Sequence, residues 1–372
     1  MTPIFIALLV NFFVDEVLPK YKEKYMKEIL MISNMYPSIE KPYAGIYVKN
    51  LYEKLKCDNA LGTVSLLAME RRFTGKLGSI IKYFRFITTT IPSLFKRYDI
   101  VHLHFIYPLI IWAFLYKLFH PKSKVVVTCH GSDVNKHFTG YFSRLFFSYL
   151  ATKIDVVVTV GSELAKAVKI KLGKEVSYVI PAGIDERVFY NVEQLKCEYD
   201  LIFVGSFLKL KGLPELVEAL LQIDKKLRIC FVGSGPLESI IRSLNNKHEV
   251  EIKHNLNQQQ LREMYCRAKF LVLPSKSEAF GLVVSEAMFC GTPVIASRIG
   301  GIQEQLEEGV NGFYIETVEP NSIVSSINKA LKVDKSTYSK LCLNALSSNR
   351  QFSLDQVCQQ YRELYLAQME HS

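Results

Sequence analysis

The feature that most constrains the fold of this 372-residue chain is an alternation of short apolar runs with helical patterns, which occurs in two series. The runs of the first series are EILMIS (28–33), DIVHLHF (99–105), KVVVTC (124–129), DVVVTV (155–160) and VSYVI (176–180). Short β-branched runs bounded by turn residues are typical of buried parallel strands. Helical patterns at 45–56 and 162–172 lie between them. The alternation predicts a doubly wound α/β domain.

The second series begins near residue 199 and repeats the same alternation. Its strand patterns are YDLIFVG, LRICFVG, VEIKHN, FLVLPS, PVIAS and GFYIE, and its helical patterns cover 213–223, 236–244, 258–267, 282–290 and 302–308. The polar, turn-rich segment at 181–200 between the two series is a candidate hinge. We therefore expect two Rossmann-like domains that face each other across a cleft, with ligands at the C-terminal ends of the strands.

Four segments follow from this interpretation. Residues 26–193 form the N-terminal domain and residues 194–350 the C-terminal domain, while 351–372 contain a last amphipathic helix that could cross back to the N-terminal domain. Residues 1–25 include an apolar run without a basic segment before it or a small-residue cleavage site after it. Because MKEILMISNMYP reads as a natural start of the first strand, we interpret 1–25 as an appended or misassigned leader.

The charge of the chain is unevenly distributed. Residues 1–190 hold 26 Lys and Arg against 15 Asp and Glu, a net charge of +11, whereas residues 191–372 hold 20 against 21, a net charge of −1. Within 71–124 there are ten basic residues and one acid, Asp99, among many Phe, Tyr, Ile and Leu. A basic, aromatic surface suits an anionic membrane face, and no nucleic-acid-binding module is readable. A solvated basic face without a partner is the alternative.

Membrane-spanning and redox signals are both weak. No apolar stretch reaches the roughly 20 residues of a spanning helix, and FIYPLIIWAFLY (105–116), interrupted by Pro108, reads as a strand end followed by a buried helix. The eight cysteines form no C-x-x-C pair, which favours free thiols in a reducing cytosol. We expect a cytoplasmic protein that is peripheral at the inner face of a membrane.

The stretch SEAFGLVVSEAMFCGTPVIAS (277–297) carries the clearest chemistry. A strand precedes it, and the pattern predicts a helix from Leu282 to Gly291. Backbone N–H groups at that helix start, next to Gly281, can hold a phosphate. Glu286 can accept hydrogen bonds from ribose hydroxyls, and Glu278 points to the far side of the phosphate. A phosphate with a polyol on each side describes a nucleotide-sugar; the alternative is a surface helix with two solvated glutamates.

Residues 269–312 resemble the donor-binding segment of glycosyltransferase family 4, whose members have the GT-B architecture. The matching features are Pro-Ser before the first Glu, the Phe-Gly-Leu turn, Glu-Ala in the helix, Gly-Thr-Pro-Val after it, and Gly-Gly with Glu304. The resemblance implies that Glu286 binds the ribose and Glu278 the transferred sugar. The backbone of the turn would bind the distal phosphate through Ala279, Phe280, Gly281 and Leu282.

A second segment, FVGSFLKLKGLPEL (203–216), resembles the first strand, loop and helix of the family's donor domain. In the family an Arg after the strand's Gly and a Lys before a second Gly neutralise the pyrophosphate. Lys211 fits the second role. Ser206 stands where the Arg is usual, so either Lys209 supplies the lost charge or the site has one cation fewer.

Two segments of the first half also resemble the family. SNMYPSIEKPYAGIYVKNL (33–51) is similar to its opening loop, which implies that Gly45 brings a helix start to the donor phosphate. VTCHGSDV (127–134) follows a strand, and the resemblance places His130 near the transferred sugar and Asp133 near sugar or acceptor hydroxyls. His130 and Glu278 are therefore the expected catalytic residues. His102 and His104 alternate with apolar residues on a strand, and we interpret both as structural.

The resemblance implies a retaining transfer of a sugar from a nucleotide-sugar, most commonly a UDP-sugar, with GDP and ADP as alternative leaving nucleotides. The basic, aromatic stretch 71–124 suggests a glycan or lipid-linked oligosaccharide as acceptor, in the synthesis of bacterial surface polysaccharide such as lipopolysaccharide or capsule. No metal and no other cofactor is expected, because H-E-x-x-H, D-x-D and a cysteine cluster are all missing from the sequence. A catalytically degenerate sugar-nucleotide-binding or scaffold protein is the main alternative. An NDP-sugar 2-epimerase lacks the paired glutamates, and an NAD(P) oxidoreductase needs a glycine where Glu238 stands.

Overall fold

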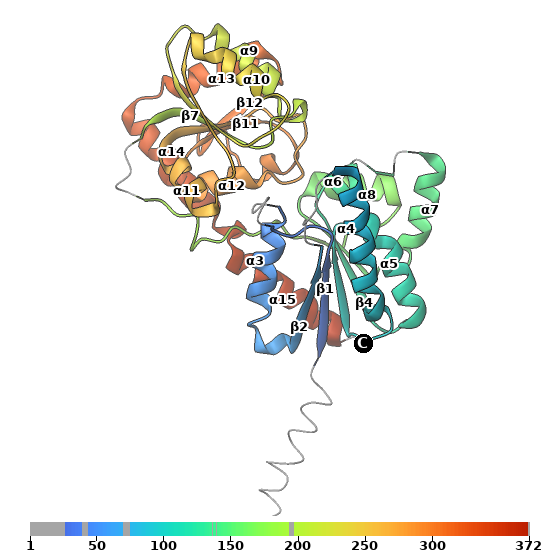
Figure 1. The fold of residues 1–372 in the computed structure, drawn as a ribbon. Coiled ribbons are helices and arrows are strands. Elements are labelled where there is room, and N and C mark those ends of the chain that lie inside the picture. The colour runs from blue at the N-terminus through green and yellow to red at the C-terminus, as the bar shows by residue number, and fades with distance from the viewer. Residues whose placement is uncertain are drawn as a thin grey trace, which may run out of the picture.

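The computed structural model describes residues 27–38, 44–69, 75–135, 137–138, 140–192 and 197–370, with the backbone alone for 75–80, 82 and 83. Figure 1 shows two α/β domains joined by a narrow connection, each built around its own sheet. The expected leader at 1–25 lies outside the described residues.

The sheet of the N-terminal domain has six parallel strands in the order β2-β1-β3-β4-β5-β6. The strands are β1 (Glu28–Ser33), β2 (Thr63–Ala68), β3 (Ile100–His104), β4 (Lys124–Cys129), β5 (Val156–Thr159) and β6 (Tyr178–Val179). The helices are α3 (Ile46–Leu55), α4 (Gly75–Thr90), α5 (Ile106–Phe119), α6 (Ser132–Asn135), α7 (Tyr141–Ala151) and α8 (Ser162–Leu172). Strand β4 is buried from Val125 to Cys129, as expected of a strand covered on both faces.

The sheet of the C-terminal domain is also parallel and six-stranded, in the order β12-β11-β10-β7-β8-β9. Its strands are β7 (Tyr199–Val204), β8 (Arg228–Val232), β9 (Glu249–Lys253), β10 (Ala268–Leu273), β11 (Val294–Ser297) and β12 (Gly312–Ile315). Its helices are α9 (Leu213–Gln222), α10 (Glu238–Arg242), α11 (Gln258–Cys266), α12 (Leu282–Phe289), α13 (Pro320–Leu331) and α14 (Lys335–Ser348). The predicted fold class is confirmed. The helix predicted at 302–308 is wrong, because a 3-10 turn at Gly300–Glu304 takes that place.

The last helix, α15 (Leu354–Glu370), packs on the N-terminal domain although it follows the C-terminal one in the chain (Figure 1). Its buried residues, which include Tyr361 and Tyr365, share a hydrophobic cluster with strand β1 and helix α3. Two backbone hydrogen bonds mark the crossing: Ile184 N–H donates to the Phe352 carbonyl (2.9 Å), and Leu354 N–H donates to the Ile184 carbonyl (2.7 Å). These bonds join the two segments that connect the domains, one at Ile184 and the other at Phe352–Leu354.

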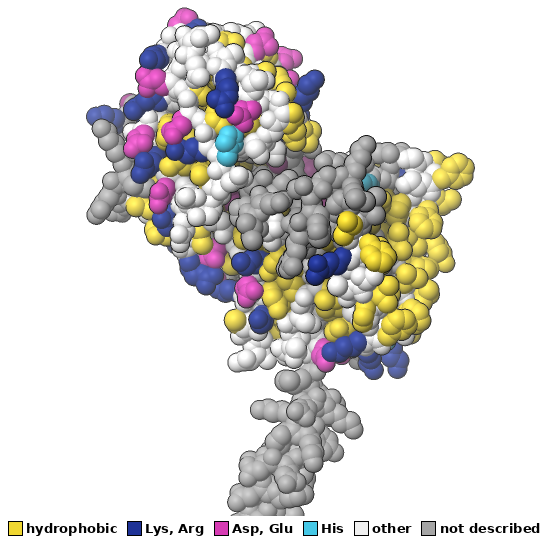
Figure 2. All heavy atoms as spheres, viewed as in Figure 1, with side chains coloured by type: hydrophobic (Ala, Val, Ile, Leu, Met, Phe, Trp, Pro, Cys, Tyr) yellow, Lys and Arg dark blue, Asp and Glu magenta, His cyan; other side chains and the backbone are white. Residues whose placement is uncertain are grey.

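Helix α5 differs from the buried helix that its sequence predicts. One side packs into the core through Leu109, Ile110 and Trp112, but Ile111 and Leu118 on the other side are 45% and 57% exposed. Hydrophobic side chains on α4, the 3-10 turn Ile91–Leu94 and its C-cap Phe95, and α7 continue this surface, which Figure 2 shows over α5 and α7. We call it the apolar face; its described members are Ile81, Phe84, Ile87, Ile91, Phe95, Ile111, Leu115, Leu118, Phe119, Tyr141, Phe142, Leu145, Phe146 and Tyr149. Among the described residues, no helix has both the length and the apolar character to cross a bilayer.

Candidate active site

A cavity of about 580 Å³ lies between the two domains, at the C-terminal ends of both sheets. Its lining from the N-terminal domain comes from Tyr47, His130, Gly131, Ser132, Asn135, Val160 and Ala182, and its lining from the C-terminal domain from Leu210, Lys211 and residues 277–283. Parallel α/β sheets place ligands at this edge. The site residues predicted in the Glu278–Leu282 segment, together with Lys211 and His130, therefore line one cavity.

Helix α12 starts at the floor of this cavity. Gly281 is its N-cap and has φ 86°, a left-handed conformation that L side chains rarely adopt. The N–H groups of Leu282 and Val283 open the helix, where backbone donors have no partner within the helix itself. A negatively charged group would be stabilised there by those donors and by the helix dipole.

Gln305 fixes the shape of the turn, and no pattern in the sequence points to this role. Its amide nitrogen donates to the carbonyl of Phe280 (2.5 Å), and its oxygen accepts from the Ser285 hydroxyl (2.5 Å). The ring of Phe280 is buried against Phe352 of the crossing segment, with 5.3 Å between the ring centroids. Because these contacts come from two distant segments, the turn is held rigidly between them.

Glu286 lies within α12 and is 8% exposed. Its Oε2 accepts a hydrogen bond from the hydroxyl of Tyr265 on α11 (2.9 Å). Burial raises the pKa of the Glu286 carboxyl to about 7, while the hydrogen bond from Tyr265 lowers it. Tyr265 is a second residue that the motif analysis missed, because it reads as an ordinary core aromatic of an amphipathic helix.

Glu278 stands on the other side of the turn, with its side chain 12% exposed. Its Oε1 accepts from the Ser275 hydroxyl (2.8 Å) and from the Lys211 ammonium. The predicted sugar ligand and the predicted phosphate cation are thus paired with each other. A diphosphate that enters the cavity would compete with Glu278 for Lys211.

His130 follows strand β4 and lies on the N-terminal side of the cavity. Its ring packs on those of Tyr47 (4.8 Å between centroids) and Phe105 (4.5 Å), and its Nε2 lies 3.2 Å from Nδ1 of His104. Asp133 is buried, and burial raises the pKa of its carboxyl to about 6.

The contacts of Asp133 are made to the backbone. Its Oδ1 accepts from His130 N–H (3.0 Å) and its Oδ2 from Ile106 N–H (2.7 Å). It therefore holds the loops after β3 and β4 together. The predicted contact of Asp133 with sugar or acceptor hydroxyls stays a prediction, and these bonds give the carboxyl a positioning role.

The two domains touch across the cavity at Ala279. A Cβ added to Gly131 would lie 2.4 Å from the Cβ of Ala279, and one added to Gly161 would lie 2.6 Å from the Ala279 carbonyl oxygen. Both distances are shorter than real Cβ contacts, so glycine is required at 131 and 161 for this approach. Glu304 of the C-terminal domain also bonds to Ser162 of α8. The cleft is closed around the cavity.

Comparison with known proteins decides the family. Residues 58–188 match the family described as Glycosyltransferase Family 4, and residues 190–345 match Glycosyl transferases group 1. The chain is a group 1, family 4 glycosyltransferase.

Individual relatives agree with this assignment. The chain is 27% identical over 360 residues to an uncharacterized glycosyltransferase of Methanocaldococcus jannaschii, covering 91% of this chain and 99% of that one. It is 29% identical over 287 residues to the N-acetyl-alpha-D-glucosaminyl L-malate synthase of Bacillus anthracis, covering 73% and 75%. The fold matches that of Anabaena HepE in complex with UDP and glucose, with a TM-score of 0.70, 19% identity, and coverage of 92% and 100%.

Four of the predicted donor-binding residues of this glycosyltransferase are not among those that line the cavity: Gly45, Ser206, Lys209 and Glu286. Ser206 and Lys209 are exposed in the loop after β7, and within the described chain Lys209 makes no ion pair. Gly45 is the N-cap of α3 with φ 70°, and a Cβ there would lie 2.5 Å from the Met35 carbonyl oxygen. Its glycine is therefore required by the turn itself, and its contact with phosphate stays a prediction.

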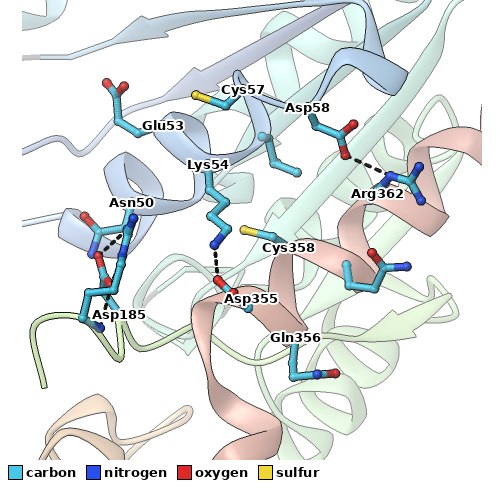
Figure 3. A pocket seen from close by; sticks show the side chains of 13 residues that line it. Asn50, Glu53, Lys54, Cys57, Asp58, Asp185, Asp355, Gln356, Cys358 and Arg362 are labelled. Carbon is cyan, nitrogen blue, oxygen red and sulfur yellow. Dashed lines mark hydrogen bonds and ion pairs between the residues drawn. The ribbon is translucent and has the colours of Figure 1, made fainter. Parts of the chain in front are cut away.

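A larger cavity of about 740 Å³ lies behind the hinge of the glycosyltransferase, between α3, α15 and the linker (Figure 3). Its cations are each paired with a carboxylate: Lys54 with Asp355, Arg187 with Asp185 (2.8 Å), and Arg362 with Asp58 (2.9 Å). Glu53 adds a fourth carboxylate to the three cations. The lining is net negative, which disfavours a diphosphate, so this cavity is not the candidate donor site.

Among the described residues, no group of three or more His, Cys, Asp or Glu is arranged to hold a metal ion. Metal independence remains a prediction for this glycosyltransferase. Lys211 and the backbone at the start of α12 face the cavity and can stabilise a leaving diphosphate.

Proposed function

We propose that this glycosyltransferase transfers a sugar from a UDP-sugar, with retention and without a metal, to a glycan or lipid-linked oligosaccharide in surface polysaccharide synthesis. The observation that carries the donor half is the arrangement around α12. A helix start with a left-handed glycine stands between two poorly exposed carboxylates, Glu278 and Glu286, beside the cation Lys211. That arrangement suits a diphosphate with a sugar on one side and a ribose on the other.

In the proposed reaction, the bond between the anomeric carbon and the distal phosphate oxygen breaks, and the acceptor oxygen attacks on the same face. The acceptor proton passes to an oxygen of the leaving diphosphate. Lys211 and the α12 backbone stabilise the charge that develops on that diphosphate, as preorganised donors do in a cavity that excludes water. Glu278 and His130 hold the sugar. The structure of Anabaena HepE, which has the same fold, is a complex with UDP and glucose, and this supports the choice of donor class.

The apolar face supports a lipid-linked acceptor at a membrane. It holds 14 of the 22 large hydrophobic side chains that are exposed in the described chain. Ring contacts join its parts: Phe95 lies 5.3 Å from Phe119. A monomer rarely exposes so large an apolar surface without a partner. The partner proposed is an anionic bilayer, because the exposed cations Arg85, Lys96 and Arg97 lie on or beside the same elements.

We extend the proposed membrane contact beyond the stretch 71–124. Helix α7, at Tyr141–Ala151, contributes Tyr141 (76% exposed) and Phe142 (82% exposed) and lies outside the stretch 71–124. Of the ten basic residues in that stretch, Arg71 and Arg72 lie outside the described residues. Contact with the cytoplasmic face of the inner membrane, through α4, α5 and α7 together, is therefore part of the proposal.

The donor half is tested by a thermal-shift panel of UDP, GDP, ADP and CDP on the wild type, Glu286→Ala and the control Glu218→Ala. Glu218 is exposed on α9, away from the cavity. We expect UDP to raise the melting temperature of the wild type and of the control, and not that of Glu286→Ala. No response to any nucleotide in a folded wild-type sample would overturn the proposal and favour a degenerate scaffold protein.

The proposed acceptor is tested by incubating the protein with a radiolabelled UDP-sugar and either a lipid extract of membranes or L-malate. L-malate is chosen because one relative is an N-acetyl-alpha-D-glucosaminyl L-malate synthase. Label in the lipid fraction is the expected result. Label on malate alone would replace the lipid-linked acceptor by a small hydroxy acid, with the donor half unchanged.

A further inference from the structure

A contact between two imidazoles, His104 and His130, suggests which ring nitrogen of His130 carries its proton. His104 ends β3, and His130 follows β4, the next strand of the sheet. Nδ1 of His104 lies 3.2 Å from Nε2 of His130. The rings of Tyr47 and Phe105 also pack against the His130 imidazole. The hydrogen-bonding partner of that imidazole is the His104 ring.

Both rings are neutral at physiological pH. Burial lowers the pKa of the His104 imidazole to about 3, and burial together with His104 lowers that of His130 well below its ordinary value. In a neutral pair one ring must donate the shared proton and the other must accept it. Two tautomeric arrangements are therefore available, and they differ in what each ring carries on its other nitrogen.

The surroundings of His104 discriminate between them. Its Nε2 is buried and has no hydrogen-bond partner in the structure. If His130 donated, the proton of His104 would sit on that Nε2 as a buried N–H without an acceptor, a rare and costly arrangement. If His104 donates from Nδ1, its Nε2 carries a lone pair instead, and no orphan N–H results.

We propose that His104 is a positioning residue that donates to Nε2 of His130 and so fixes the His130 proton on Nδ1. His130 then offers the cavity an N–H donor for a hydroxyl of the transferred sugar, and does not act there as a base. The inference about the sugar rests on the proposed function, whereas the inference about the proton does not. His104 thereby gains a functional role in place of the structural one that its alternating strand pattern indicates.

The test is a two-bond ¹H–¹⁵N spectrum of ¹⁵N-histidine-labelled, ligand-free protein, which reports the tautomer of each ring and requires no substrate. His130 is assigned by its absence in His130→Gln. We expect the proton of His130 on Nδ1 in the wild type and on Nε2, or on both, in His104→Leu. His102→Leu is the matched control, since His102 lies two residues earlier on β3 and bonds to Tyr365 (2.5 Å) and Thr128 (2.7 Å). It is expected to lower the melting temperature and leave the His130 tautomer unchanged.

Kinetics complete the test. His104→Leu should lower kcat for transfer from a UDP-sugar about tenfold, and His104→Gln, which keeps a side-chain N–H donor, should recover most of it. A wild-type His130 proton on Nε2 would overturn the proposal, as would a tautomer that is unchanged in His104→Leu. If the tautomer shifts as expected and no variant binds a nucleotide or transfers a sugar, the proton assignment holds and the proposed function fails.

Discussion

Glu304 of the C-terminal domain accepts two hydrogen bonds from Ser162 of the N-terminal domain, one from its backbone N–H and one from its hydroxyl, each 2.7 Å long. Ser162 is the first residue of α8, so the carboxylate also faces the positive end of a helix dipole. This side chain therefore links the two domains close to Ala279, which lines the cavity between them. The same contact would have to break whenever the cleft opens.

Replacing Glu304 should shift the protein toward an open cleft. Hydrogen bonds to a charged group contribute about 1.5–3 kcal/mol each. We expect Glu304→Ala to increase the radius of gyration in small-angle X-ray scattering and to lower kcat, with UDP binding retained. Glu307→Ala, an exposed neighbour, is the control. An unchanged scattering curve in Glu304→Ala would show that the link does not govern closure.

A methyl group at Gly161 should block closure sterically. The backbone there has φ −167°, which any residue adopts, so the substitution brings no local strain. Its Cβ would nevertheless lie 2.6 Å from the Ala279 carbonyl oxygen of the opposite domain. We expect Gly161→Ala to keep its melting temperature and UDP affinity and to lose at least tenfold in kcat. Gly140→Ala, whose Cβ would meet nothing within 4 Å, should behave as wild type.

The buried carboxyl of Glu286 should make stability fall as the pH rises. Its pKa of about 7 lies above the ordinary value of 4.5, so the folded protein binds the proton more tightly than the unfolded chain. The free energy of unfolding should therefore decrease between pH 4.5 and pH 7, by up to about 3 kcal/mol from this group. Asp133, with a pKa of about 6, acts in the same direction, and His104 in the opposite one. Urea titrations of wild type and Glu286→Gln isolate the contribution as a difference.

Nucleotide binding should depend on the same proton. The ionised Glu286 is the better acceptor for ribose hydroxyls. The Kd for UDP-glucose, whose diphosphate does not titrate near neutrality, should therefore fall as the pH rises through 7. Calorimetric titrations at pH 6 and pH 8 measure this change. An equal pH dependence in Glu286→Gln would assign it to another group.

The apolar face should bind anionic vesicles. Burying one large apolar side chain contributes about 1.5–3 kcal/mol, so the double variant Phe142→Ser, Phe146→Ser should lose at least about a hundredfold in vesicle affinity. Cosedimentation with phosphatidylglycerol vesicles at low and high salt measures the loss. Leu343→Ser removes a 65% exposed side chain from α14 of the other domain and should bind as wild type. Equal binding by all three proteins would contradict the assignment of this face.

Local patterns were enough to find the donor segment. Gly281 and Glu286 lie in one continuous strand–turn–helix, and the periodicity of that segment fixes which groups meet at the helix start. Tyr265, Gln305 and His104 could not be found in this way. They lie 21, 20 and 26 residues from their partners Glu286, Ser285 and His130, and only folding brings them together.

The solvent exposure of apolar side chains could not be predicted from the sequence pattern either. An apolar helix such as α5 reads as buried, because periodicity reports the existence of an apolar side and not what covers it. The sequence pattern also gives no sign of the backbone contacts of Asp133, whose two oxygens accept hydrogen bonds from the N–H groups of His130 and Ile106. The exposure of α5 and these contacts both depend on long-range packing.

The sequence by itself determined the two parallel sheets, the family, and the segment that carries Glu278, Gly281 and Glu286. These depend on local periodicity and on backbone needs that a few neighbouring residues express. The tertiary structure decided the pairing of Lys211 with Glu278, the hydrogen bonds from Ser162 to Glu304 between the domains, and the position of α15 on the N-terminal domain. Those contacts join residues far apart in the chain, and their energies arise only when both partners are brought into one place.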